Sequence, residues 1–343
     1  MDNKERIFAL SSAIGPTGAE QDAAQVAKEL LRPYMDSVTG DLNGNVIGIR
    51  TAKTRGARCL LLDAHLDEVG MMVRGYDEGF LQFASIGIDP RVLPGLEVKV
   101  CTEPPIFGVV TCLPPHVLTA EEQDKAFDMD KLRVDCGLSK EEIEERVPIG
   151  TRIVYNTQPF AMGKHLVCGK SLDDRACFAI LVRTMELLKD EDLAMDVVVL
   201  GSVQEEYTGV GAKTGAYNMM PDEAIIVDVS FAKQPDVGED ESSPLGSGPM
   251  IGVGPVLNRR MNQRLMDQAK KHDIPYTIEV LSGRTGTNAD DIQITRNGVN
   301  VACLSLPLRY MHTPIEVVDL RDVENAARLL AAYIRSMGED TPC

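Results

Sequence analysis

The sequence lacks the features that mark secreted, membrane or zinc-finger proteins. Its eight cysteines form no CxxC or other close pair, and several lie in apolar runs, where a reduced cysteine acts as a small hydrophobic residue. No apolar run approaches the roughly 18 residues that a membrane-spanning helix needs. The first residues show no signal peptide. We therefore expect a cytoplasmic protein whose cysteines are reduced and structural.

Basic residues are also scarce. Lys and Arg number 35 against 52 Asp and Glu, so the formal net charge is −17 at pH 7. Such a surface repels phosphate backbones and anionic lipids, so we expect no nucleic acid and no membrane as partners. Hydrophobic residues make up 44% of the 343 residues, which is enough for a buried core. The length predicts two ordinary domains or one large one.

Short apolar runs alternate with helical patterns along much of the chain. The runs are typical of strands buried on both faces, and they lie at 58–65, 196–203, 224–229 and 300–306. Amphipathic or apolar helical patterns lie at 20–35, 174–189, 256–272 and 319–336. The alternation predicts an α/β fold with a mixed, mostly parallel sheet flanked by helices.

Residues 73–163 have a different sequence pattern. They contain short β-type segments broken by Gly and Pro, with one clear helical pattern near 139–146. We interpret them as a small β-rich domain inserted into an α/β domain made of residues 1–72 and 164–343.

Acids and histidines lie at or near the predicted ends of the buried strands, where ligands bind in open α/β sheets. Each alone has a structural explanation, such as helix capping or a satisfied core polar group. On a strand, the neighbours Glu205 and Glu206 would point to opposite sides, so one could bind a metal while the other reaches the reacting water. The candidates are His65, Asp67, Asp173, Glu205, Glu206, Asp228 and His312.

Together these residues favour a metal site over chance capping. Mixed nitrogen and oxygen ligands suit Zn²⁺, Co²⁺ or Mn²⁺ better than Ca²⁺. Two His, two Asp and one Glu, with one bridging carboxylate, would hold two ions about 3.5–4 Å apart.

Several motifs together resemble the M42 family of metalloaminopeptidases. They are HLDEVGMMV, GKSLDDRACFAILV, VLGSVQEEYTGVGAK, IIVDVSFA and LRYMHTPIEVVDLRDVE. The segments IGIDPRVLPGLEVKV and EEIEERVPIGTRIVY resemble the inserted domain of that family, and GRTGTNADDIQITRNGVN resembles its substrate-pocket loop. That loop often reads GTDAGA in the family, so the preferred N-terminal residue stays open.

The resemblance implies a zinc-exopeptidase-like fold with a small β-barrel-like insertion used for dimerisation. It implies two divalent ions per subunit, with Zn²⁺ favoured over Co²⁺ and Mn²⁺. His65 and Asp228 would hold one ion and Glu206 and His312 the other, with Asp173 bridging.

The same resemblance assigns the general base to Glu205 and the orientation of His65 to Asp67. A metal-activated water would then hydrolyse N-terminal residues from peptides with a free N-terminus. The peptide bond between Asp173 and Asp174 is often cis in related enzymes. The resemblance also implies a homo-oligomer built from dimers, including dodecamers.

Three other functions remain open at this point. They are a related metal-dependent deacylase or carboxypeptidase, a glycosidase using paired carboxylates, and a non-catalytic assembly protein on the same fold. Two adjacent glutamates that point apart would not flank one glycosidic bond. The glycine-rich segment 246–252 lacks GxGxxG spacing, and the acidic run 238–243 is more typical of a solvated loop.

Overall fold

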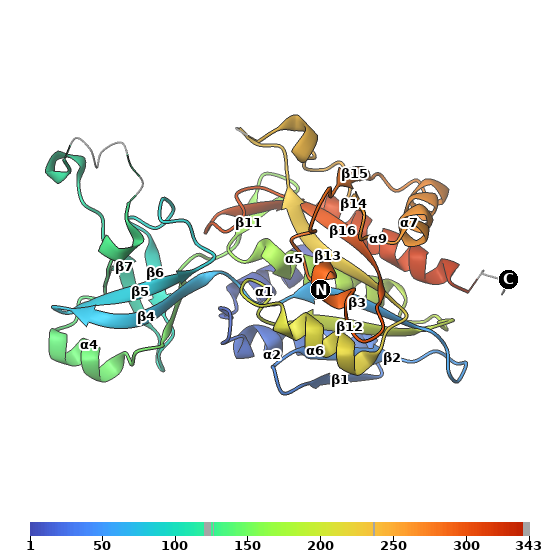
Figure 1. Ribbon diagram of the computed structural model, residues 1–343, viewed down its shortest axis with the longest axis horizontal. Coiled ribbons are helices and arrows are strands. Elements are labelled where there is room, and N and C mark those ends of the chain that lie inside the picture. Colours follow the sequence, from blue (N-terminus) through green and yellow to red (C-terminus); the bar gives the residue numbers. More distant parts are fainter. Residues whose placement is uncertain (120–124, 126, 236, 339–343) are drawn as a thin grey trace.

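The computed structural model describes residues 1–119, 125, 127–235 and 237–338. It consists of a large α/β part and a barrel at its side (Figure 1). The α/β part is built on an eight-stranded sheet, whose strands in spatial order are β1 (Ser37–Gly40), β2 (Val46–Arg50), β12 (Asp196–Ser202), β3 (Cys59–His65), β13 (Glu223–Phe231), β16 (Asn300–Leu308), β14 (Met250–Val253) and β15 (Thr277–Val280).

The central strands β12, β3, β13 and β16 are parallel to one another. The antiparallel pairs β1–β2, β2–β12 and β14–β16 lie toward the two edges. This confirms the predicted mixed, mostly parallel sheet. Alternate residues of the central strands are buried on opposite faces, which explains why these strands read as continuous apolar runs.

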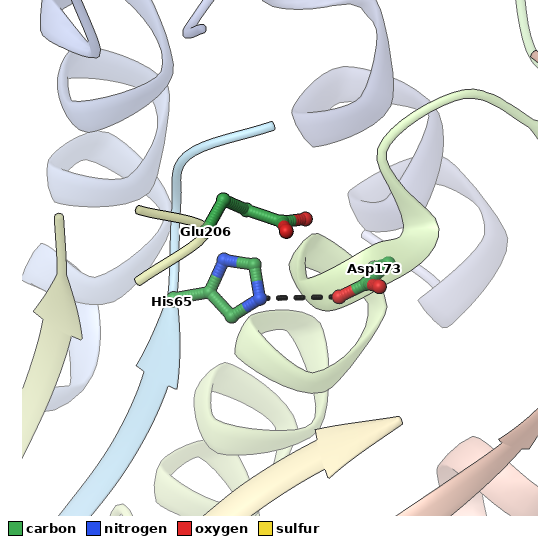
Figure 2. A group of neighbouring side chains, drawn as sticks. All are labelled: His65, Asp173 and Glu206. Carbon is green, nitrogen blue, oxygen red and sulfur yellow. Dashed lines mark hydrogen bonds and ion pairs between the residues drawn. The ribbon is translucent and has the colours of Figure 1, made fainter. Parts of the chain in front are cut away.

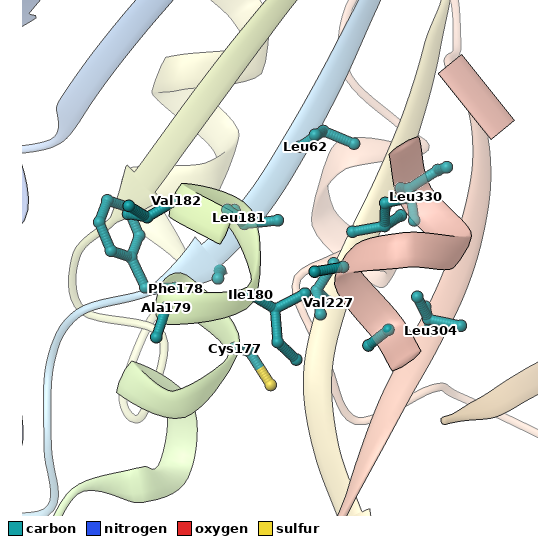
Figure 3. Packing of buried hydrophobic residues seen from close by; sticks show 14 of the residues in the cluster. Leu62, Cys177, Phe178, Ala179, Ile180, Leu181, Val182, Val227, Leu304 and Leu330 are labelled. Atoms are coloured by element: carbon teal, nitrogen blue, oxygen red, sulfur yellow. The ribbon is translucent and has the colours of Figure 1, made fainter. Parts of the chain in front are cut away.

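Helices cover both faces of the sheet. The larger core lies between one face and α1 (Asn3–Ser12), α2 (Gln21–Leu31), α5 (Leu172–Leu187), α7 (Arg259–Lys271) and α9 (Leu320–Ser336). In Figure 3, side chains of α5 such as Ile180 pack toward Val227 of β13 and Leu304 of β16. The smaller core lies beneath α6 (Val210–Met219) and α8 (Ala289–Ile292) on the other face.

The predicted helices 20–35, 174–189, 256–272 and 319–336 are present with shifted ends. Helix α2 stops at Leu31 because Pro33 cannot continue it, and a 3₁₀ turn (Arg32–Tyr34) follows. Helices α1 and α6 were not predicted. Helix α6 carries Gly211 and Gly215 at positions that pack tightly against Val203 and Leu200, so it lacks an amphipathic pattern.

The six-stranded barrel has a core of its own. Its strands close in the order β4 (Gly70–Asp77), β5 (Phe80–Ile86), β8 (Val134–Asp135), β7 (Ile106–Val110), β6 (Glu97–Val100) and β9 (Arg152–Tyr155). Residues such as Val98, Val134 and Ile153 fill it, and α4 (Lys140–Arg146) packs beside it. The barrel confirms the predicted small β-barrel-like insertion. The division at 73 and 163 and the dimerising role stay predictions.

A third, small sheet supports the site. It contains β10 (Phe160–Met162), β11 (Leu166–Gly169) and β17 (Glu316–Asp319). Strand β11 leads directly into the segment that carries Asp173, and β17 follows the loop that carries His312.

The described residues bear on two of the sequence-based expectations, those on membrane spans and on cysteines. Among them, no helix combines the length and the hydropathy that a membrane span requires. The seven described cysteines are all free thiols, and Cys343 lies outside the described residues.

Candidate metal centre

His65 and Asp173 meet at the carboxyl end of the central strands. His65 is the last residue of β3, and Asp173 lies at the start of α5, where its backbone departs from helical geometry. The Nε2 atom of His65 is 3.1 Å from Oδ1 of Asp173. Figure 2 shows both side chains and Glu206 converging on one space. Both His65 and Asp173 are buried, at 2% and 6% exposure.

His312 approaches Asp173 from the other side. It follows β16 in a left-handed turn, with φ of 63°. Its Nε2 atom is 3.4 Å from Oδ2 of Asp173 and 3.3 Å from Oε2 of Glu206. The two carboxylate oxygens of Asp173 thus face two different imidazoles, which is the arrangement that a bridging ligand requires.

Asp228 and Asp174 form a second group with His65. One ligand atom from each of these residues lies within 4.8 Å of the others. Asp228 lies on β13, and Oδ2 of Asp174 accepts a hydrogen bond from the backbone amide of His65 at 3.0 Å. The other oxygen of Asp174 is buried and has no partner among the described residues. The bond between Asp173 and Asp174 is cis.

Glu205 and Glu206 do not follow the strand alternation that we expected. Strand β12 ends at Ser202, and Gln204 has a φ of 60°, so the chain turns before the two glutamates. Oε2 of Glu205 is 3.9 Å from Nε2 of His65, while Glu206 contacts His312. The prediction that they point to opposite sides is therefore wrong: both reach the same site, each toward a different imidazole.

Asp67 contacts both this turn and His65. One of its oxygens accepts the backbone amide of Glu205 at 2.9 Å, and the other accepts that of Glu206 at 3.2 Å. Oδ1 is also 3.3 Å from Nδ1 of His65. A carboxylate at Nδ1 leaves Nε2 of a neutral imidazole free to bind a metal. Thr17 donates its hydroxyl to Asp67 at 2.8 Å.

Three groups in or around the site were not assigned a role from the sequence. Asp174 was noted only beside Asp173. Glu316 accepts backbone amides from the loops of two candidate ligands, His312 and Asp173, and the carbonyl of Gly87, from the segment after barrel strand β5, is 2.9 Å from Nδ1 of His312. The apolar residues around Glu316 in the sequence were the available signal, since a buried acid needs partners. Nothing in the sequence indicates the Gly87 contact.

The crowding of carboxylates shifts proton affinities strongly. Burial raises the pKa of Glu205 to about 9 and that of Asp228 to about 7, and neighbouring acids add to both shifts. Burial lowers the pKa of His312, but its hydrogen bonds to Asp173 and Glu206 outweigh this and raise it to about 11. In the absence of a metal ion, Glu205 and His312 are therefore protonated at neutral pH, which reduces the negative charge of the site.

Divalent cations fit this set of donors. Among the described residues, no Lys or Arg forms an ion pair with any of the five site carboxylates, which are Asp173, Asp174, Glu205, Glu206 and Asp228. Buried acids without basic partners are costly, and the unpartnered oxygen of Asp174 adds to that cost. Imidazole nitrogens with carboxylate oxygens suit Zn²⁺, Co²⁺ and Mn²⁺.

Comparison with known proteins identifies relatives over nearly the whole chain. The sequence model of the M42 glutamyl aminopeptidase family matches residues 44–329. A lysyl aminopeptidase of Pyrococcus furiosus is 35% identical over 316 residues, covering 90% of this chain and 90% of that protein.

Solved structures agree with this match. An aminopeptidase from the archaeon Desulfurococcus kamchatkensis gives a TM-score of 0.90 at 34% identity, covering 97% of this chain and 94% of that chain. The TET1 peptidase of Pyrococcus horikoshii, described as able to assemble into a tetrahedron or a large octahedral shell, gives 0.85 at 28% identity, covering 97% and 99%. The chain therefore belongs to the M42 family of aminopeptidases, hydrolases that act at the N-termini of peptides.

Proposed function

We propose that this aminopeptidase works with two divalent ions per subunit, Zn²⁺ before Co²⁺ or Mn²⁺. His65 and Asp228 would hold one ion, Glu206 and His312 would hold the other, and Asp173 would be shared between them. The observation that carries this proposal is the placement of Asp173, whose two oxygens face His65 at 3.1 Å and His312 at 3.4 Å. The burial of these acids without basic partners supports it.

Glu205 is proposed as the general base. When bound, the ions polarise the substrate carbonyl and acidify water. Glu205 accepts a proton as the water oxygen attacks the scissile carbonyl carbon, and it returns that proton to the amine nitrogen as the C–N bond breaks. Its side chain is 18% exposed, against 7% for Glu206 and 6% for Asp173, so it is the most accessible of these three carboxylates.

Asp67 is proposed to position both partners of this step. Its carboxylate binds the amides of Glu205 and Glu206, and it lies against Nδ1 of His65. It thereby fixes the general base relative to the metal-facing nitrogen of His65. A rigid base near the attacked carbonyl lowers the barrier by orientation as well as by proton transfer.

The test measures activity and metal content together. Wild type loaded with Zn²⁺, Co²⁺ or Mn²⁺ is expected to release amino acids from peptides and amino-acid amides, and EDTA to stop the release. Glu205→Gln should lower kcat by about 10²–10⁴-fold with metal content unchanged. Glu239→Gln, an exposed surface change, is the control. Near-normal turnover by Glu205→Gln would refute the assignment. Release from acylated or C-terminal substrates alone would favour a deacylase or carboxypeptidase.

We further propose that residues 73–163 form a dimerisation domain and that dimers build a larger homo-oligomer, such as a dodecamer. In β7, Phe107 and Val109 alternate with buried residues, yet they are 62% and 46% exposed. Neighbouring apolar side chains exposed on the outside of the barrel are typical of an interaction surface. The assembly described for the Pyrococcus horikoshii relative supports the larger oligomer.

A further inference from the structure

A cavity lies next to the candidate metal centre on the outer part of the sheet. It has a volume of about 450 Å³ and opens between β13, β15 and the loop 281–287. Its wall includes Val229, which follows Asp228 in sequence, and Met311, which precedes His312. A substrate held at the metal centre therefore has this cavity beside it.

Strand register places Glu279 on the same face of the sheet as Asp228. Asp228 pairs with Ser305 across β13 and β16, and Ser305 pairs with Met250 of β14. Met250 in turn pairs with Thr277, two residues before Glu279 on β15. Paired residues share a face and so do alternate residues of a strand. Asp228, Ser305 and Glu279 therefore lie on one face.

Glu279 presents a negative charge to this cavity. Its two oxygens accept hydroxyl hydrogen bonds, one from Ser230 and one from Ser305 at 2.6 Å. Hydroxyl donors fix the carboxylate in place but do not neutralise it. Within the described part of the chain, no Lys or Arg lines the cavity, and the other charged residue in its wall is Glu241.

The remaining wall is mixed. Met250, Leu281 and Met311 contribute apolar surface, and polar side chains come from Ser242, Ser243, Thr285 and Thr287. The apolar part suits a long aliphatic stem, and the carboxylate suits a cationic end. A short substrate side chain would not reach the carboxylate of Glu279. An acidic one would be repelled by it.

The loop that resembles the substrate-pocket loop of the family contributes Thr285, Gly286 and Thr287 to this cavity, so the side chain of the substrate's N-terminal residue is expected here. We propose that Glu279 makes the enzyme prefer lysine or arginine at that position. The proposal rests on the aminopeptidase function proposed above. Glu279 is a specificity residue and takes no part in the proton transfers assigned to Glu205.

The test compares lysine with norleucine, which has the same stem without the ammonium group. Wild type is expected to hydrolyse lysyl 4-nitroanilide with a kcat/KM at least about 10-fold above that for norleucyl 4-nitroanilide. Glu279→Gln should reduce this ratio by about 10- to 100-fold, because its amide keeps the size but removes the charge. Glu239→Gln, whose carboxylate is exposed and paired with Lys233, should keep the wild-type ratio.

The outcomes separate this inference from the function on which it rests. A wild type that cleaves norleucyl or glutamyl substrates as well as lysyl ones would overturn the inference and keep the aminopeptidase. An equal loss on lysine and norleucine in Glu279→Gln would also overturn it. Cleavage of none of these substrates would overturn both. The wild-type ratio of kcat/KM for the lysyl over the norleucyl substrate tests the inference without any variant. A misfolded Glu279→Gln therefore does not remove the test.

Discussion

The carboxylate of Glu316 accepts a hydrogen bond from the backbone amide of His312 at 2.9 Å. Its second oxygen accepts the amides of Leu172 and Asp173 at 2.7 and 3.1 Å. Glu316 is 2% exposed, so water does not compete for these bonds. One buried side chain therefore joins the loop of His312 to the loop of Asp173.

Glu316→Gln should weaken metal binding. A glutamine places an NH₂ group against backbone N–H donors on one of its two sides, so one loop loses its acceptor. We expect the affinity for Zn²⁺ to fall about 10- to 100-fold, as for other groups that orient metal ligands. Competition with a chromophoric chelator measures it, with Glu239→Gln as the control. Wild-type affinity in Glu316→Gln would show that the two loops are held by other contacts.

The sequence was sufficient to place the candidate ligands that sit on regular elements. His65 and Asp228 lie at or near the ends of long apolar strands, and parallel strands bring such ends to one edge. The central sheet, four of its helices and a β-rich insertion were also predictable, because their apolar patterns reflect burial on one face or on two. The barrel form of the insertion was implied by the family resemblance.

The parts that were missed depend on tertiary contacts or on local backbone geometry. Gly87 comes from the segment after barrel strand β5 and reaches His312 only because the barrel folds beside the sheet. Glu205 and Glu206 follow a turn at Gln204 with positive φ, which strand periodicity does not reveal. Helix α6 is rich in small residues, so its pattern carries no amphipathic signal.

Metal binding should release protons. Without metal, the hydrogen bonds of His65 to Asp173 and Asp67 outweigh burial and raise its pKa well above the usual value, and the pKa of His312 is about 11. Both imidazoles therefore carry a proton at pH 7, and each must lose it to bind an ion. We expect about one proton released per histidine, further protons from Glu205 and Asp228, whose pKa values are raised to about 9 and about 7, and an affinity that rises from pH 6 to 9. Calorimetry in two buffers of different ionisation enthalpy counts these protons; no release would mean that the histidines are not ligands.

Phe107→Asp should disrupt assembly without loss of fold. Phe107 points outward from β7 at 62% exposure, so a charge there costs the isolated subunit little. At an apolar interface the same charge would be buried without a partner. Sedimentation velocity should show a smaller species than wild type, with unchanged circular dichroism. An unchanged assembly would place the interface elsewhere, and Leu42→Asp, at a fully exposed apolar residue of the α/β part, serves as the charge-matched comparison.

Glu68 should make stability depend on pH below 5. It lies 2.7 Å from Lys170 and 3.1 Å from Arg175, and all three side chains are at most 4% exposed. Burial raises the pKa of Glu68, but the charges of Lys170 and Arg175 outweigh this and lower it from 4.5 to about 2. A depressed carboxyl pKa stabilises the fold above the unfolded value, and this contribution is lost as the pH falls from 4.5 through 2.

Glu68→Gln removes the partner of two buried cations, so we expect it to cost about 3–5 kcal/mol at pH 7. Its unfolding free energy should also fall less steeply than that of wild type between pH 5 and pH 2.5, because the carboxyl that titrates there is gone. Urea unfolding at both pH values, with Glu324→Gln at a partly exposed ion pair as the control, measures the difference. Parallel slopes for wild type and Glu68→Gln would contradict the lowered pKa. Since Glu68 follows Asp67 and Lys170 precedes Asp173 by three residues, the same ion pair joins the segments of the candidate ligands His65 and Asp173, and its loss should lower metal affinity along with stability.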